Sequence, residues 1–294
     1  MSRSSSSRAN RRGELPPDPE PLPAPVVDSH THLDIAVGGF DRAPDAAEVD
    51  AQVAAAEAVG VPRLVQVGVD VPSSRWSAEL AARHPNVLAA VAVHPNEAGS
   101  WVDDGGDMDT ALAEIDRLAA QPRVRAVGET GLDRFRTGPE GWAAQEASFR
   151  AHIRIAKERG KALVIHDRDA HDEILRVLDD EGAPERTVFH CFSGDAAFAR
   201  ACVARGHVLS FAGTLTFANA GYLREAAALT PLDQLLVETD APFLTPVPYR
   251  GRPNASRLVP HTVRTLAEVT GVDLEQLCAA LTATAERVFG PWED

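Results

Sequence analysis

Short apolar runs alternate with longer amphipathic stretches along almost the whole chain after residue 25. Short runs bounded by polar or proline residues are typical of buried strands, and apolar spacing of three to four residues is typical of helices. We predict strands over 26–32, 63–69, 87–93, 124–129, 162–167, 187–192, 207–211 and 235–239. We predict helices over stretches that include 45–59, 109–120, 141–160, 169–180, 195–205, 219–229, 260–270 and 273–288.

Eight strand–helix units in one run predict an α/β fold, a single (β/α)8 TIM barrel over residues 26–294. Such a barrel typically takes about 250 residues. A doubly wound open sheet is the alternative, and it would gather ligands in one crevice. Polar residues instead follow five separate strands, and a barrel mouth collects residues from all of its strands. The pattern therefore favours the barrel.

The first 25 residues have a different composition from the rest of the chain. They begin rich in Ser and Arg and then become rich in Pro. Such a segment cannot build a core, and its proline-rich half should be stiff and extended. We therefore predict that residues 1–25 form a disordered tail that does not pack on the barrel.

Charge and cysteine content narrow the class of protein. The formal charge of −14 argues against a protein that coats duplex nucleic acid electrostatically. It does not exclude a nuclease, because bound metal ions supply positive charge locally. Three cysteines are too few for a disulfide framework, which favours a reducing, cytoplasmic setting. No apolar run is long enough to span a membrane, and nothing indicates an obligate protein partner.

The first predicted strand ends in Asp28-Ser-His-Thr-His-Leu-Asp34. Side chains alternate along a strand, so His30 and His32 point to the same face. Burying two neighbouring imidazoles without a metal or an acid would be costly. We therefore predict that both bind a divalent metal, and that Asp28 or Asp34 orients an imidazole.

Four later strands also end in side chains that bind metals. Glu129, His166, His190 and Asp240 follow the fourth, fifth, sixth and eighth apolar runs. We predict that all four are metal ligands, that Glu129 bridges two ions, and that Asp240 also accepts a proton from the attacking water. His94 ends the third run and is predicted to contact substrate.

The predicted ligands offer nitrogen and oxygen but no thiolate. This set suits Zn²⁺, Mn²⁺, Mg²⁺, Co²⁺ or Ni²⁺ in a hydrolytic site and does not choose among them. Glu238 lies one pleat deeper than Asp240 on the same face, and we expect it to orient a ligand. We predict two divalent ions per chain.

Together these motifs resemble the TatD family of metal-dependent deoxyribonucleases, from about Val26 to Phe289. The matching segments also include Val93-His-Pro95, Gly128-Glu-Thr-Gly-Leu-Asp133, Ile165-His-Asp-Arg168, Phe189-His-Cys-Phe-Ser-Gly194, Glu238-Thr-Asp-Ala-Pro-Phe-Leu244 and Tyr249-Arg-Gly-Arg-Pro-Asn254. The resemblance implies a TIM barrel, two divalent metals and hydrolysis of nucleic-acid phosphodiesters, often as a 3′–5′ exonuclease. Within the last segment we take Arg250 and Asn254 as substrate-binding residues.

A metal-dependent esterase or amidohydrolase, such as an aminoacyl-tRNA deacylase, is the alternative function. Many amidohydrolases place a carboxylated lysine where this chain has Glu129, and its two lysines, Lys157 and Lys161, lie elsewhere. That difference favours the subclass in which a glutamate bridges the metals. A non-catalytic scaffold is disfavoured because the ligand set is intact. The expected partner is DNA, through single-stranded ends, with tRNA as the alternative.

Two features bear on how nucleic acid would be held. Arg134 and Arg136 follow the fourth-strand motif and are either phosphate contacts or members of a solvated loop. Aromatic residues make up only 5% of the chain, which limits base stacking as a binding mode. Trp101 and Phe217 are the candidates for aromatic residues at the mouth.

Overall fold

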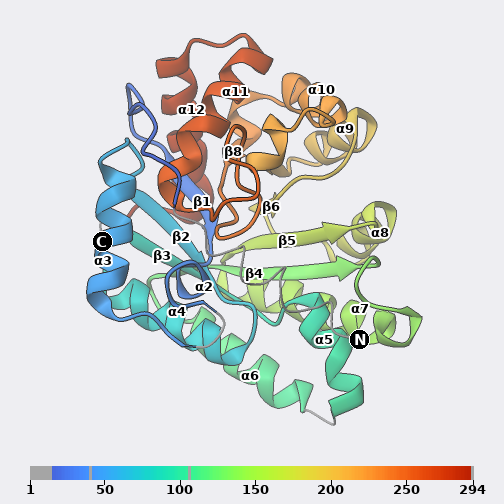
Figure 1. Ribbon diagram of the computed structural model, residues 1–294. Helices are drawn as coiled ribbons and strands as arrows, with labels where there is room; N and C mark the ends of the chain where they lie inside the picture. The colour runs from blue at the N-terminus through green and yellow to red at the C-terminus, as the bar shows by residue number, and fades with distance from the viewer. Residues whose placement is uncertain (1–14, 40–41, 105–106, 293–294) are drawn as a thin grey trace, which may run out of the picture.

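Eight parallel strands form a single barrel in the computed structural model, which describes residues 15–39, 42–104 and 107–292 (Figure 1). The strands neighbour one another in sequence order, from the first to the eighth. This confirms the predicted (β/α)8 barrel. The strands are β1 (Val27–Thr31), β2 (Arg63–Val67), β3 (Val87–Val91), β4 (Val124–Asp133), β5 (Ala162–Arg168), β6 (Thr187–Phe189), β7 (Val208–Phe211) and β8 (Leu235–Val237).

Helices cover the outside of the barrel, and the predicted helices lie within a few residues of the observed ones. In addition, the structure has α2 (Leu33–Gly38), α4 (Val71–Arg83) and α5 (Pro95–Asp104). The others are α3 (Ala46–Glu57), α6 (Met108–Ala119), α7 (Pro139–Arg159), α8 (His171–Glu181), α9 (Ala196–Ala204), α10 (Gly221–Leu229), α11 (Val259–Thr270) and α12 (Leu274–Phe289), with short 3₁₀ turns η1 (Gly213–Thr216), η2 (Leu232–Gln234) and η3 (Ser256–Leu258). Across the described ranges, no helix is both long and apolar enough to cross a bilayer.

The interior of the barrel is filled by apolar side chains from alternate strand positions. This inner cluster includes Val65, Val67, Leu88 and Ala90, each fully or almost fully buried. The end of α12 joins the same cluster through side chains such as Phe289. Because the interior is packed, polar chemistry is confined to the mouth at the carboxyl ends of the strands.

The barrel closes where β8 meets β1. Beyond the last regular residue of β8, the backbone N–H of Asp240 donates to the carbonyl of His30 at 2.9 Å. The N–H of His32 donates to the carbonyl of Ala241, also at 2.9 Å, and Thr31 bridges Ala241. The first and last strands are therefore joined at the point where the metal-ligand candidates emerge.

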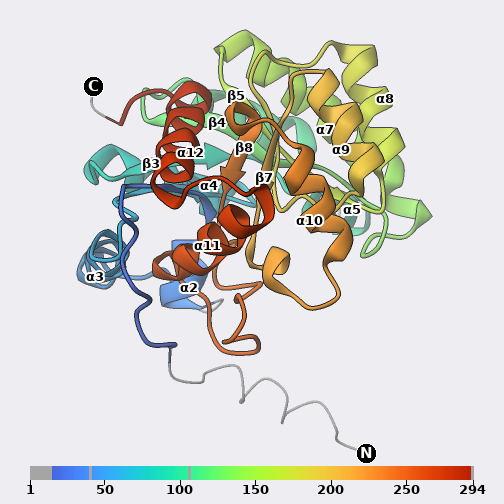
Figure 2. The ribbon, with the colours of Figure 1, turned by 90° about the horizontal axis from the view of Figure 1, so that it is seen from above.

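Residues 15–25, called the strap below, correct the prediction of a tail that does not pack on the barrel. The strap is extended, as predicted, but it runs beside α11 (Figure 2). Leu22 is buried, and its N–H donates to the carbonyl of Val59. Arg252, Arg257 and Arg264 donate to strap carbonyls. Residues 1–14 of the predicted tail lie outside the described residues.

The proline-rich composition explains why this docking has no signature in the sequence. Apart from Leu22, the strap is held mainly through its backbone carbonyls, which any residue type provides. The arginines that hold it are more than 230 residues away in the sequence. Arg257, for example, pairs with Asp18 and donates to the carbonyl of Pro16. Local periodicity carries no information on such contacts.

Removing the strap is expected to lower thermal stability. Burial of the Leu22 side chain and several hydrogen bonds together contribute about 3 kcal/mol, which is roughly 5–10 °C in unfolding temperature for a chain of this size. Differential scanning fluorimetry would compare the full chain with variants that begin at residue 15 and at residue 26. The first variant keeps every strap contact and is the matched control; equal unfolding temperatures for both variants would contradict the prediction.

Candidate metal centre

The predicted ligands meet at the mouth of the barrel, each delivered by the end of a strand. His30 lies in β1 and His32 follows that strand directly, while Glu129 lies in β4 and His166 in β5. His190 follows β6 directly, and Asp240 follows β8 by three residues. Asp240 has a left-handed backbone, with φ of 55°, a conformation that Asp and Asn tolerate better than most residues.

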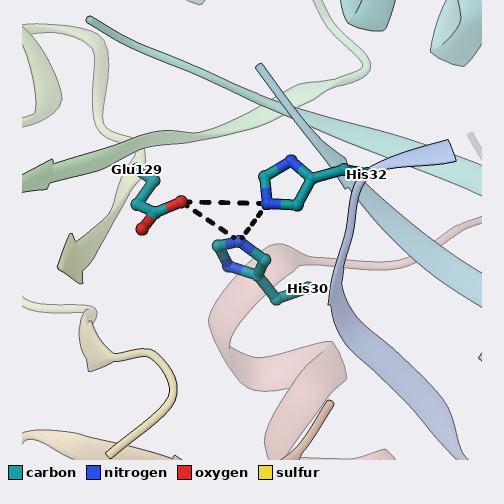
Figure 3. Close-up of side chains that lie close together, drawn as sticks. All are labelled: His30, His32 and Glu129. Carbon is teal, nitrogen blue, oxygen red and sulfur yellow. Dashed lines mark hydrogen bonds and ion pairs between the residues drawn. The ribbon is translucent and has the colours of Figure 1, made fainter. Parts of the chain in front are cut away.

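A first group of donors faces one point between β1, β4 and β8. His30 Nε2 lies 3.3 Å from His32 Nε2 and 3.4 Å from Glu129 Oε2 (Figure 3). Asp240 Oδ1 lies 3.4 Å from His32 Nε2 and 3.8 Å from His30 Nε2. Two nitrogens and two carboxylate oxygens thus converge on one small volume.

These separations suit a four-coordinate ion. Bonds of about 2.0–2.2 Å to a tetrahedral zinc place its ligands roughly 3.3–3.6 Å apart. The distances from His30 Nε2 to His32 and Glu129, and from His32 Nε2 to Asp240, are within that range; His30 to Asp240 and His32 to Glu129 are longer, at 3.8 and 3.9 Å. His32 Nδ1 also bonds the carbonyl of Val67 at 3.0 Å, which turns Nε2 toward the group. The residues therefore fit a divalent cation.

A second group of donors surrounds the other oxygen of Glu129. His166 Nδ1 lies 2.7 Å from Oε1, His190 Nε2 lies 2.8 Å from it, and His94 Nε2 lies 3.3 Å from it. Oε2 faces His30 and His32, so the two oxygens of one carboxylate serve two separate sets of histidines. Glu129 therefore lies between the two groups of donors and contacts both of them.

Buried carboxylates hold the histidines from behind. Glu238 Oε1 lies 3.1 Å from His190 Nδ1 and accepts the N–H of Cys191 at 2.8 Å. Asp133 Oδ2 lies 3.1 Å from His166 Nε2. Each contact orients an imidazole that reaches Glu129, as metal-site histidines generally require. The expectation that Glu238 orients a ligand thus agrees with its position.

Asp28 does not orient an imidazole, which was one of the roles expected for it. Its carboxylate accepts the N–H and the hydroxyl of Thr239, at 2.8 and 2.6 Å. It therefore joins β1 to the segment after β8 rather than contacting an imidazole nitrogen. Burial raises the pKa of Asp28 to about 7, against the lowering effect of these hydrogen bonds. Asp34 accepts from the side-chain amide of Gln66 at 3.0 Å.

Electrostatics at the centre favour bound positive charge. Burial disfavours the charged form of His190, but the carboxylates of Glu129 and Glu238 outweigh it and raise the pKa well above its usual value. At His32, burial is likewise outweighed by Asp240, and the pKa rises to about 9. Burial alone would raise the pKa of Glu129, yet the surrounding histidines hold it well below its usual value. The negative charge of the carboxylates therefore favours a cation at the centre.

The three predicted substrate contacts have different surroundings. His94 lies among the second group of donors. Arg250 is exposed, and its guanidinium lies 4.2 Å from the ring centre of Phe217. Asn254 is buried, and its side-chain amide donates to the carbonyls of Thr239 and Phe243. That amide therefore holds the loop after β8, and the substrate contact of Asn254 stays a prediction.

The loop after β4 also differs from one expectation. Arg134 has only 8% of its side chain exposed and pairs with Glu173 at 2.9 Å, so it is not placed as a phosphate contact. Arg136 is exposed. Asp133 had no predicted role, although it ends the fourth-strand motif. Its spacing could have indicated one, because Asp133 is four residues after Glu129 and so faces the same side of the strand.

A (β/α)8 barrel with histidine and carboxylate donors at its mouth defines the class of metal-dependent hydrolases. The family described as TatD-related DNase matches residues 27–290. An uncharacterized metal-dependent hydrolase TatD from Mycobacterium tuberculosis is 46% identical over 269 residues, which cover 90% of this chain and 98% of that one. The chain therefore belongs to the TatD family and is a metal-dependent hydrolase of that family.

One further sequence relative and one solved structure are similar to this chain over most of their length. A 3′-5′ ssDNA/RNA exonuclease TatD from Citrobacter rodentium is 36% identical over 248 residues, covering 82% of this chain and 91% of that protein. The crystal structure of YJJV, a TatD homologue from Escherichia coli, superimposes with a TM-score of 0.80 at 25% identity, covering 90% of this chain and 98% of that one. Both match across the barrel and not only at single motifs.

Proposed function

We propose that this protein hydrolyses phosphodiester bonds at the unpaired ends of nucleic acid, as a 3′–5′ exonuclease acting on DNA. The observation that carries the proposal is the position of Glu129, whose two oxygens face two separate groups of histidines. Paired metal positions of this kind suit in-line displacement at phosphorus. The name of the Citrobacter relative supports the choice of substrate and direction.

Six side chains are assigned to two divalent ions. His30, His32 and Asp240 would hold one ion, His166 and His190 would hold the other, and Glu129 would serve both. The ions would supply an activated water and charge stabilisation for the leaving oxygen. His94, the remaining member of the second group, is assigned to substrate contact, as is the exposed Arg250.

Asp240 is assigned the proton transfer. Its side chain is 14% exposed, whereas that of His30 is fully buried, so Asp240 is the first-group residue that solvent reaches most easily. A carboxylate held ionised by neighbouring positive charge can accept a proton from an approaching water. The pKa of Asp240, which burial alone would raise, is lowered by His32 and the other histidines.

Metal dependence and bond type can be tested together. Exhaustive chelation is expected to abolish release of the 3′ label from a single-stranded oligonucleotide, and Mn²⁺, Mg²⁺, Co²⁺, Ni²⁺ or Zn²⁺ should restore it. A 5′-labelled copy of the oligonucleotide reports direction, and a misacylated tRNA tests ester hydrolysis. Full turnover by protein shown to be metal-free by mass spectrometry would overturn the site, and deacylation without nuclease activity would replace the proposed substrate.

A further inference from the structure

The exposed large apolar side chains of the described residues gather in segments that follow strand ends at the mouth. Phe135 and Trp142 follow β4, Tyr222 follows β7, and Phe243 and Val247 follow β8. Single exposed apolar residues need no explanation. Two of them do: Phe135 and Phe243 are hydrogen-bonded to Asp133 and Asp240 of the centre, in a chain that is poor in aromatic residues.

Phe135 is held in place by the centre itself. The carboxylate of Asp133, which contacts His166 through Oδ2, accepts the N–H of Phe135 at 2.9 Å through Oδ1. Phe135 remains 64% exposed although the guanidinium of Arg168 lies 4.1 Å from the centre of its ring. An aromatic face and a cation are thus presented together beside the second group of donors.

Phe243 has the corresponding position beside the first group. Its ring meets that of His32 edge to face, with ring centres 6.2 Å apart. Its N–H donates to the carbonyl of Asp240 at 2.8 Å, and its own carbonyl accepts from the buried Asn254. The ring is 39% exposed, so a firmly anchored backbone carries an aromatic side chain that solvent reaches.

We propose that Phe135 and Phe243 are base-stacking positions on the two sides of the metal centre, an inference that rests on the proposed function. The occupant is a single strand whose unpaired bases stack on these rings. In this arrangement Arg168, beside Phe135, and Arg250, after β8, supply positive charge for the phosphates of that strand. Stacking of this kind tolerates any base, because every base has an aromatic face. Bases inside a duplex are already stacked, so duplex ends must fray first.

This assignment changes the expectation drawn from composition. Few aromatic residues were expected to mean little base stacking, but their placement matters more than their number. Phe217, a predicted mouth residue, lies under Arg250; the side chain of Trp101 lies outside the described residues. The alternative is that the arginines only cover apolar rings and that the rings do not contact substrate. It predicts that KM does not depend on whether the substrate carries a base.

A cycle of protein and substrate changes separates the two readings. Phe135→Leu and Phe243→Leu keep an apolar side chain but remove the aromatic face. Each is expected to raise KM for a single-stranded oligonucleotide about tenfold with little change in kcat, in line with the cost of losing one stacked base. Tyr222→Leu is the matched control, since Tyr222 is exposed to a similar degree at 46% and contacts neither donor group in the described structure.

The same enzymes are then assayed on oligonucleotides that carry abasic residues at the 3′ end. If the rings stack on bases, wild type loses its advantage on abasic substrate and the variants lose nothing further. Equal KM values for wild type and both variants on normal substrate would overturn the inference, as would equal losses on normal and abasic substrates. Absence of any cleavage by wild type would instead overturn the proposed function, and the stacking positions with it.

Discussion

Replacing Glu129 with alanine is expected to lower the rate of oligonucleotide hydrolysis by about a thousandfold, or about 4 kcal/mol of transition-state stabilisation. The reason is that this one carboxylate faces both groups of histidines, with Oε2 3.4 Å from His30 and Oε1 2.7 Å from His166. Its loss removes a ligand from each proposed ion. It also removes the negative charge around which His94, His166 and His190 gather.

The measurement pairs initial rates with metal content. Inductively coupled plasma mass spectrometry should show fewer ions per chain in Glu129→Ala than in wild type, while circular dichroism shows an intact barrel, because the residue lies at the mouth and not in the packed interior. Glu140→Ala is the control, since Glu140 is an exposed carboxylate in the first turn of α7. Near-normal rate and metal content in Glu129→Ala would refute the bridging assignment.

Replacing Asp240 with asparagine is expected to abolish most turnover while binding persists. Asparagine keeps the shape and one oxygen that can bind a cation, but it cannot accept the proton of the attacking water. Loss of a positioned base typically lowers rates by about 10²–10⁴-fold. Oligonucleotide affinity and metal content should change far less, which would distinguish a lost base from a lost ligand.

Backbone conformation supplies a matched control for this change. Asp169, which is exposed just after β5, has φ of 57°, close to the 55° of Asp240. Asn tolerates such angles as well as Asp does, so neither substitution strains the chain. Asp169→Asn is expected to retain wild-type turnover. Normal turnover in Asp240→Asn would rule out the base role, whatever its metal content.

The barrel was predictable because its strands are short, apolar and separated by helical periods, and that pattern is local. The gathering of His30, His32 and Glu129 followed from the same pattern, since strand ends of one barrel open at one mouth. The extension of β4 to Asp133 was not predictable. Glycines normally disfavour strands, yet here Gly131, with φ of 146°, runs so close to β5 that a Cβ would lie 2.1 Å from the carbonyl oxygen of His166.

The features that sequence reasoning missed share a physical cause. Asn254 reads as a polar loop residue, and only the fold shows that its amide is consumed by the carbonyls of Thr239 and Phe243. Phe135 reads as one apolar residue in a charged loop, and only the fold shows it anchored to Asp133. Both depend on contacts that the sequence does not encode locally.

The strap also has a consequence for the order in which the protein is made. Residues 15–25 are synthesised long before the residues that hold them: the carbonyl of Pro25 accepts from Thr282, and that of Leu15 accepts from Arg252. Contacts between such distant positions form late, and synthesis proceeds from the amino terminus. His30 and His32 lie near the start of the chain, whereas Asp240, which completes the first group of donors, is made more than 200 residues later. A nascent chain that stops before Asp240 would therefore present His30, His32 and Glu129 without the fourth donor.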